Sequence, residues 1–337
     1  MNKLLAFLAL AVVAVGFMVV RQSTLVRQGK HSFVRKAIEL TSATSVKSLV
    51  GSPDFDRIEL SPTATILYSA VRKQVRIYQD SSYRMQSEIP LPSSAVTLVG
   101  GQVLNDALYL LDYKYRLYQT SLTTLATRTR AFHQIKFDRA ILVNDSTILT
   151  KQTLAANPQN ESFVLYNLKS GRKLNEFAVL PKNNDYGFNT DGAFSKDSNI
   201  IYFKCYLNSR TYCFNGKGEY QTTFSEINGV DKKYAVTNQG GNITFSEPIK
   251  PLTVAIATHD TNLYVYSAIA AANDHDGREY IDIYSPRGGY LHSLSISTAG
   301  DGAKILGFAL RGEVLYILRH DRIETHALPR LSGVAAY

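Results

Sequence analysis

The chain has 337 residues, including 21 Tyr and 15 Phe but no Trp, and charged residues make up only 19% of it. Its formal net charge is +9, but six basic residues and no acidic residue fall within residues 1–36, so the remainder carries a net charge of only +3. A globular part this close to neutrality lacks the basic footprint of a nucleic-acid-binding protein, so we do not expect nucleic acid as a partner.

The amino-terminal segment is predicted to hold the protein at a membrane. An unbroken apolar run, residues 4–20, follows Lys3 and ends at Arg21. As a helix the run would span about 25 Å, the lower limit for crossing a bilayer. We expect residues 1–21 to be an uncleaved signal anchor, with a cleaved signal peptide as the alternative. Residues 22–36 are predicted to form a basic linker next to the membrane.

The orientation of this segment is open on sequence grounds. More basic residues follow the apolar run than precede it, and the positive-inside rule would therefore keep the following part in the cytoplasm. The signal-like layout favours export instead. We expect a membrane-anchored or secreted protein whose globular domain lies outside the cytoplasm, in the bacterial periplasm or at the cell surface.

One short pattern recurs along the rest of the chain. Its clearest copies are Arg76–Gln79 and Arg116–Gln119, and looser copies are Val164–Asn167, Tyr212–Asn215, Asp282–Ser285 and Arg322–Thr325. Each copy follows a turn and an apolar run with strand-like alternation. Self-similarity at about 40 to 50 residues, with several strands per unit, is typical of propeller blades.

The units follow one another in chain order with one interruption. The predicted blades cover residues 56–91, 95–132, 137–180, 186–227, 252–296 and 305–328, and an insertion is predicted near residues 228–249. The last unit has only three predicted strands, and a strand from residues 37–50 can supply the fourth and close the ring. We predict an all-β fold: a six-bladed β-propeller of four-stranded antiparallel blades over residues 37–337, preceded by an amino-terminal hydrophobic helix.

Two cysteines, Cys205 and Cys213, fall in one predicted hairpin of the fourth blade. If Asn208–Arg210 forms the loop, the two are cross-strand neighbours with β-carbons close enough for a disulfide. The alternative is that they pack side by side as small apolar residues. Export to an oxidising compartment would favour the disulfide.

Candidate binding residues lie where the innermost strands are predicted to begin and end. Two strand starts share the motif Phe-Asp-Arg, and the candidates for the mouth of the channel are Asp56, Arg57, Asp138, Arg139, Asp191 and His259. Such groups around a ring could hold a polar ligand or a side chain of a partner protein. The competing interpretation is that each Asp–Arg pair fixes a loop at the entry to its blade.

The period and strand pattern of these residues resemble the six-bladed propeller superfamily, including TolB-like and NHL-like domains and bacterial membrane-anchored propeller proteins. The repeat fold, the anchor and the lack of a catalytic constellation in the sequence lead us to expect a non-catalytic module that binds a protein or a small polar ligand at a propeller face. An alternative within the same resemblance is a lactonase-like or hydrolase-like enzyme holding Ca²⁺ in its channel, for which Asp56, Asp138, Asp191 and His259 would have to converge. The sequence shows no catalytic motif, and we predict neither a cofactor nor a bound metal.

Overall fold

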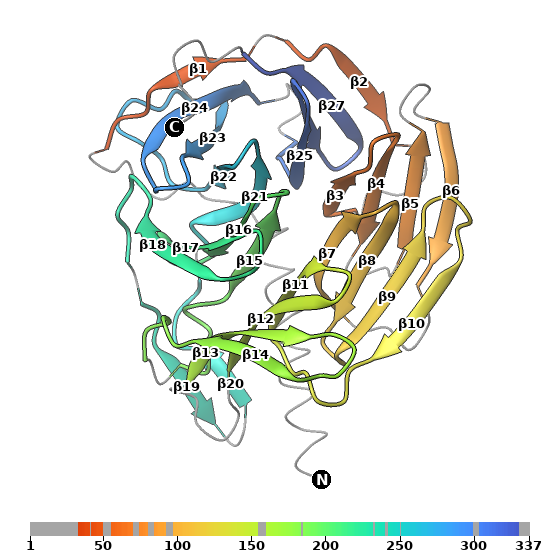
Figure 1. Ribbon diagram of the computed structural model, residues 1–337. Coiled ribbons are helices and arrows are strands. Elements are labelled where there is room, and N and C mark those ends of the chain that lie inside the picture. The colour runs from red at the N-terminus through yellow and green to blue at the C-terminus, as the bar shows by residue number, and fades with distance from the viewer. Residues whose placement is uncertain are drawn as a thin grey trace.

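The computed structural model describes residues 33–40, 42–49, 55–69, 74–79, 84–91, 97–153, 160–182, 185–231, 233–239, 242–249, 251–298 and 303–329. Its strands form sheets that are arranged radially around a central axis (Figure 1). The predicted anchor, residues 1–21, and linker residues 22–32 lie outside the described residues. Within the described ranges, no helix has the length and apolar character needed to cross a membrane.

The described strands build six blades, and in each blade the first strand is the innermost. Blade one contains β3 (Arg57–Leu60), β4 (Ala64–Ser69), β5 (Gln74–Gln79) and β6 (Arg84–Pro90). Blade two contains β7 (Leu98–Leu104), β8 (Ala107–Asp112), β9 (Arg116–Ser121) and β10 (Thr127–Ala131). Blade three contains β11 (Arg139–Asn144), β12 (Thr147–Thr153), β13 (Glu161–Asn167) and β14 (Lys173–Phe177).

The second half of the ring repeats this order. Blade four contains β15 (Gly192–Lys196), β16 (Ile200–Cys205), β17 (Arg210–Asn215) and β18 (Tyr220–Ser225). Blade five contains β21 (Thr253–His259), β22 (Asn262–Ser267), β23 (Arg278–Tyr284) and β24 (Tyr290–Ser297). Blade six contains β25 (Gly307–Arg311), β26 (Val314–Leu318), β27 (Arg322–Ala327) and β2 (Ser45–Ser48). The predicted six-bladed propeller of four-stranded antiparallel blades is thus confirmed.

The repeated sequence pattern falls in the third strand from the channel in every blade, namely β5, β9, β13, β17, β23 and β27. Apolar side chains of neighbouring blades pack against each other; Ile66 and Ile77 of blade one, for example, share a cluster with Leu108 and Leu110 of blade two. Burying one such side chain contributes about 1.5–3 kcal/mol. A single blade leaves this surface open, so the blades are stable only next to one another.

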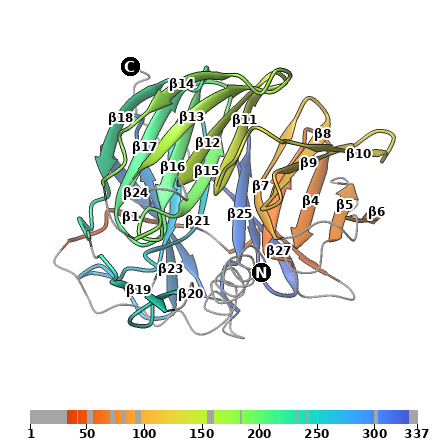
Figure 2. The same cartoon turned by 90° about the horizontal axis from the view of Figure 1, so that it is seen from below.

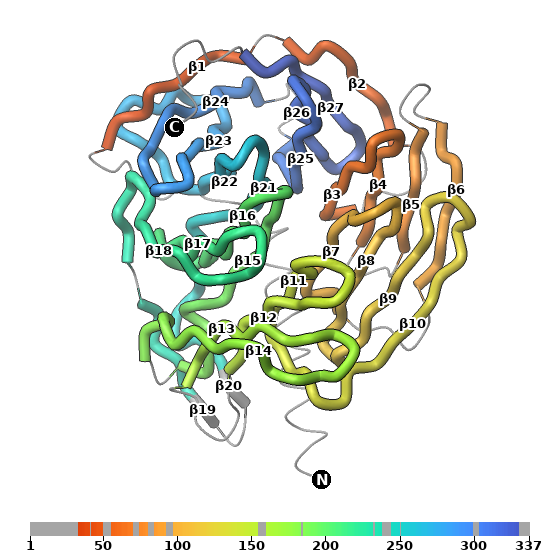
Figure 3. The backbone as a smooth tube through the Cα atoms, viewed as in Figure 1, coloured from red at the N-terminus to blue at the C-terminus, as the bar shows by residue number. Residues whose placement is uncertain are grey.

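The amino-terminal strands meet the carboxy-terminal ones at the rim of the ring, where red and blue segments lie together in Figure 3. β2 is antiparallel to β27 and supplies the outermost strand of blade six. The other strand of this region, β1 (Ala37–Glu39), does not join blade six; it runs parallel to β24 and gives blade five a fifth strand. A strand from residues 37–50 thus completes the last blade, whereas the pairing of β1 with blade five was not predicted.

Arg35 explains why β1 lies on blade five. This residue is only 3% exposed. Its guanidinium donates two hydrogen bonds to Asp282, at 2.8 and 3.1 Å, and one to the Ile269 carbonyl at 2.9 Å, and it also forms an ion pair with Asp274. Residues 33–36, predicted as the end of a basic linker, therefore belong to the folded body. Arg35 is bound to blade five and is not a group available to lipid headgroups.

The two cysteines are buried and free, which overturns the predicted disulfide. The register pairs Cys213 with Tyr202 and Lys204 with Thr211, so Cys205 and Cys213 are not cross-strand partners. Cys205 packs with the core shared by blades three and four, whereas Cys213 packs with the core shared by blades four and five. The loop of this hairpin begins at Tyr206, earlier than predicted, and that shift moves the two side chains to opposite faces of the sheet.

A separate hairpin lies between blades four and five in the chain. It consists of β19 (Val236–Gln239) and β20 (Asn242–Phe245), and it stands off the ring in Figure 2. The Phe245 ring contacts the Phe188 ring edge-on, with centroids 5.2 Å apart. The backbone N–H of Tyr234 donates to the Asn189 side chain at 2.7 Å, and that side chain donates back to the Tyr234 carbonyl at 2.8 Å. The hairpin region is thereby fixed to the loop that precedes β15.

Candidate functional site

The candidate site is the central channel, a cavity of about 400 Å³ bordered by the innermost strands β3, β7, β11, β15, β21 and β25. Small residues keep these strands close together. A β-carbon at Gly100 would lie 2.4 Å from the Ala140 carbonyl oxygen of the next blade, so only glycine fits this position. The cavity falls within the usual volume range of small-molecule sites.

Two contacts show that neighbouring inner strands run in the same direction. Arg139, the first residue of β11, donates from Nε to the carbonyl of Gly192, the first residue of β15, at 2.8 Å. Lys196, the last residue of β15, donates to the carbonyl of Val143 near the end of β11. The channel therefore has one mouth where the inner strands begin, called here the start mouth, and one where they end, called the end mouth.

At the start mouth an ion pair joins two blades. The guanidinium of Arg139 lies 2.6 Å from the Asp191 carboxylate and donates to the Tyr113 hydroxyl at 2.8 Å. Burial alone would lower the pKa of Arg139, but Asp191 and Tyr113 together raise it above its usual value. The predicted local pair of Asp138 with Arg139 is thus replaced by a pair between Arg139 and the next blade.

Asp138 belongs to a second group of charges at the same mouth. Its carboxylate accepts a hydrogen bond from the Thr153 hydroxyl at 2.7 Å and lies 3.8 Å from the Lys151 ammonium. Lys151 in turn lies 3.2 Å from the carboxylate of Glu161, and both side chains are almost completely buried. Sequence analysis did not single out Lys151 or Glu161, because their pairing depends on how β12 lies against β13.

Asp56 and Arg57 lie at the start of β3, where their side chains are only loosely paired, with Nε of Arg57 3.9 Å from the Asp56 carboxylate. Tyr206, in the hairpin loop of blade four across the channel, acts electrostatically on Arg57. Burial disfavours the charged guanidinium, whereas the negative ends of Tyr206 and Asp56 favour it, and the pKa of Arg57 is raised on balance.

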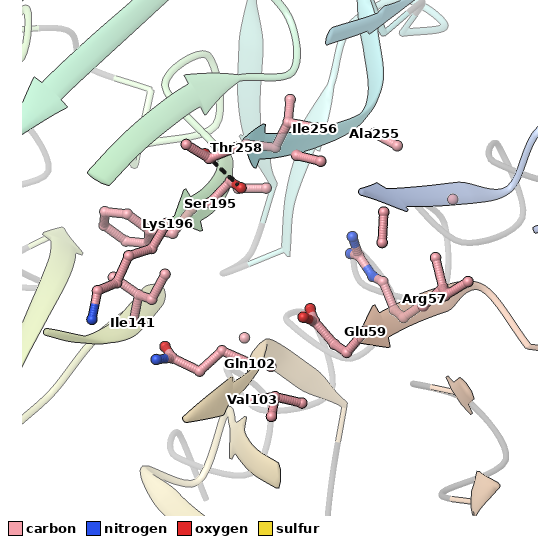
Figure 4. A pocket seen from close by; sticks show the side chains of 18 of the residues that line it. Arg57, Glu59, Gln102, Val103, Ile141, Ser195, Lys196, Ala255, Ile256 and Thr258 are labelled. Atoms are coloured by element: carbon pink, nitrogen blue, oxygen red, sulfur yellow. Dashed lines mark hydrogen bonds between the residues drawn. The ribbon is translucent and has the colours of Figure 1, made fainter. Parts of the chain in front are cut away.

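Glu59 is an acidic side chain that extends into the channel. It follows Arg57 by two residues on β3, and Figure 4 shows both side chains extending from this strand toward the open space. Burial raises the pKa of the Glu59 carboxyl to about 8, although Arg57 acts to lower it. The signal for Glu59 was present in the sequence, because residues i and i+2 of a strand point to the same face.

The other polar side chains in Figure 4 are bound to the wall of the channel. The amide of Gln102 donates to the Leu142 carbonyl at 3.0 Å and accepts from the Leu142 N–H at 2.8 Å. The hydroxyls of Thr258 and Ser195 are 2.8 Å apart. These bonds link blade two to blade three and blade four to blade five.

His259 does not join the other predicted site residues. It is the last residue of β21 and therefore lies at the end mouth, with Nε2 3.3 Å from its neighbour Asp260. Asp56, Asp138 and Asp191 lie at the start mouth, so the convergence required for a Ca²⁺ site is not formed. In the parts of the chain that the structure describes, no group of three or more His, Cys, Asp or Glu side chains is placed to hold a metal ion.

Comparisons with known proteins find structures of similar fold but assign the chain to no family. No protein-family model matches the chain, and no curated protein matches it. Among solved structures, the chain is similar to the WD40 repeats of RRP9, with 10% identity, a TM-score of 0.53 and coverage of 86% of this chain and 100% of that one. It is also similar to BamB from Moraxella catarrhalis, with 12% identity, a TM-score of 0.45 and the same coverage. Similarity at such low identity shows the fold alone, which the strand order of the ring defines as a six-bladed β-propeller.

Proposed function

We propose that this protein is a non-catalytic binding module of the TolB-like or NHL-like kind, tethered to a membrane by its amino-terminal segment and placed outside the cytoplasm. It binds a protein or a small polar ligand at the start mouth of the channel. The observation that carries the proposal is the pairing at that mouth. Arg139 binds Asp191, and Lys151 lies between Asp138 and Glu161, so these charges support a rigid rim around an open polar channel.

The tether follows from the sequence, and the fold gives it a fixed point of attachment. The chain enters the ring through residues 33–40. Within this segment, Arg35 binds Asp282 of blade five and β1 pairs with β24 of the same blade. An anchor in residues 1–21 would therefore hold the propeller by one defined blade.

The proposed location is tested by labelling one introduced cysteine in intact cells. Both native cysteines are buried, and Lys169 is exposed in the turn between β13 and β14. Lys169→Cys is expected to react with a membrane-impermeant maleimide once the outer membrane is permeabilised, while the wild-type chain does not react. Labelling that appears only after cell lysis would place the propeller in the cytoplasm and overturn the proposed location.

The proposed binding function is tested by capture from detergent-solubilised membranes. The wild-type protein is compared with Asp191→Asn, which removes the partner charge of Arg139 and disturbs the rim of the start mouth. A partner captured by the wild type and reduced with the variant supports the proposal. A partner captured equally by both would mean that binding occurs elsewhere on the ring.

The alternative function is a metal-dependent lactonase or hydrolase. The separation of His259 from the aspartates of the start mouth argues against the arrangement predicted for it. We expect the melting temperature of the purified protein to be the same with and without a chelator. A stoichiometric ion whose removal lowers the melting temperature would favour the enzyme instead.

A further inference from the structure

The channel holds a carboxylate and a guanidinium side by side without pairing them. Arg57 and Glu59 extend from one face of β3 into the cavity, but the guanidinium lies near Asp56 and is influenced by the polar side chain of Tyr206. Within the described part of the chain, no donor lies within hydrogen-bonding distance of the Glu59 carboxylate. The lumen therefore contains an acid with no hydrogen-bonding partner in this part of the chain.

The neighbouring donors are already used by the wall of the channel. The Gln102 amide is bound to the backbone of Leu142 at both its ends. The Lys196 ammonium turns away to the carbonyl of Val143, and burial lowers its pKa. These groups hold the blades together and do not bind Glu59, whose half-buried carboxylate remains open to a ligand that enters the channel.

The environment of Glu59 favours a cation in contact with it. Burial raises the pKa of the carboxyl to about 8, so a proton competes with a cation for this carboxylate near neutral pH. A positively charged group can replace that proton and form a charge-assisted hydrogen bond. Arg57 nearby would repel a ligand that carries positive charge alone, and this repulsion disfavours a simple amine.

Arg57 supplies the opposite half of the site. A guanidinium has five N–H donors in a planar fork that fits a carboxylate. Its side chain keeps 35% of its surface exposed, and its contact with Asp56 is long, at 3.9 Å. The cavity of about 400 Å³ is large enough for a small molecule that reaches both groups.

We propose that the channel binds a small zwitterion of the amino-acid class, with its carboxylate on Arg57 and its ammonium group on Glu59. This inference deepens the proposed binding function and rests on it, since it names the chemical class of a ligand for the same channel. Both charges of the ligand are needed, because either one alone would leave one of the two side chains unmatched.

The experiment measures thermal stabilisation and calorimetric binding of the full chain in detergent. The probes are the L-amino acids, tested singly at about 10 mM, with ethylamine and acetate as probes that carry one charge each. At least one amino acid is expected to raise the melting temperature, and neither single-charge probe is expected to match it. Glu59→Gln keeps the shape and is expected to weaken the binding about tenfold or more, because it removes a charged hydrogen-bond acceptor.

Two further variants complete the test. Arg57→Lys keeps the positive charge but not the fork and is expected to retain part of the affinity that Arg57→Met loses. Glu176→Gln, on the exposed outer strand of blade three, makes the same chemical change away from the channel and is expected to bind like the wild type.

The inference is overturned if no amino acid binds, if ethylamine binds equally well, or if Glu59→Gln and Glu176→Gln behave alike. The broader binding function has its own readout in the capture of a membrane partner. Loss of amino-acid binding with retained capture would therefore reject the zwitterion site alone.

Discussion

At the scale of single residues, charged side chains of the start mouth pair with partners on other strands and not with their neighbours in the sequence. The Phe-Asp-Arg motif suggested that Asp138 and Arg139 would serve each other. In the structure Arg139 binds Asp191, 52 residues later, and Asp138 lies with Thr153 and Lys151. Since buried charges need partners, each of these pairs ties two elements of the ring together.

Arg35 provides the sharpest stability test at this scale. Arg35→Met removes the cation that compensates two buried carboxylates, Asp274 and Asp282, and is expected to lower the free energy of unfolding by about 3–5 kcal/mol. The measurement is urea unfolding followed by fluorescence. Lys36→Met is the matched control, because its exposed side chain should change stability by less than about 0.5 kcal/mol. Similar stabilities for the two variants would show that Arg35 does not fix the chain to blade five.

Glu59 predicts a specific pH dependence of stability. Its pKa rises from 4.5 to about 8 on folding because burial disfavours the carboxylate, with Arg57 acting in the opposite direction. The folded state thus keeps a proton that the unfolded state loses, and this contribution to stability disappears as the pH rises from about 4.5 to about 8. Glu59→Gln removes this titration. The variant should gain stability relative to the wild type between pH 5 and pH 8, as measured by melting temperatures; a constant difference would contradict the assigned pKa.

At the scale of elements, the position of a strand follows from the local sequence pattern, whereas the strand that it pairs with depends on distant contacts. The recurring third strand of each blade was readable because alternation and turns are local features. The partner of β1 was not readable, because it depends on where Arg35 binds. The hairpin of β16 and β17 shows that strand register depends closely on where a loop begins. Because this loop starts earlier than expected, Cys205 and Cys213 lie on opposite faces of the sheet.

The contribution of β2 to closing the ring can be tested with proline. Leu49 donates its backbone N–H to the Asp321 carbonyl. In an antiparallel strand the backbone N–H groups point toward the partner strand at every second residue. The N–H of Lys47 therefore faces β27, whereas the N–H of Ser48 faces away. Lys47→Pro should therefore lower the free energy of unfolding by about 1–3 kcal/mol more than Ser48→Pro, measured by thermal unfolding. Lys47→Ala separates the loss of the side chain from that of the hydrogen bond. Equal effects of the two prolines would mean that this pairing does not stabilise the ring.

At the scale of the whole molecule, the ring is closed by elements from both ends of the sequence. β2 completes blade six, and β1 joins blade five, so residues 33–49 bridge two adjacent blades. Such closure leaves each apolar blade face covered by a neighbour. The channel is a product of this closure, since each of its walls comes from a different blade.

The folded unit is expected to be independent of the predicted anchor. A chain that starts at Phe33 keeps Arg35, β1 and β2, and should melt within about 2 °C of the full chain in the same detergent. The shortened chain should be recovered in the soluble fraction and the full chain in the membrane fraction. A full chain that is soluble would argue against the anchor, whereas a large drop in melting temperature would show that residues 1–32 stabilise the propeller.

The amino-acid sequence determined the period, the strands and the number of blades, because hydrophobic alternation and turn residues act over a few residues at a time. The tertiary structure alone decided which charges meet: Arg35 with Asp282, 247 residues away, Arg139 with Asp191, and Arg57 beside an unmatched Glu59 in the lumen. These pairings depend on the angle and register at which the blades come together around the channel, which is a property of the closed ring and of no single segment.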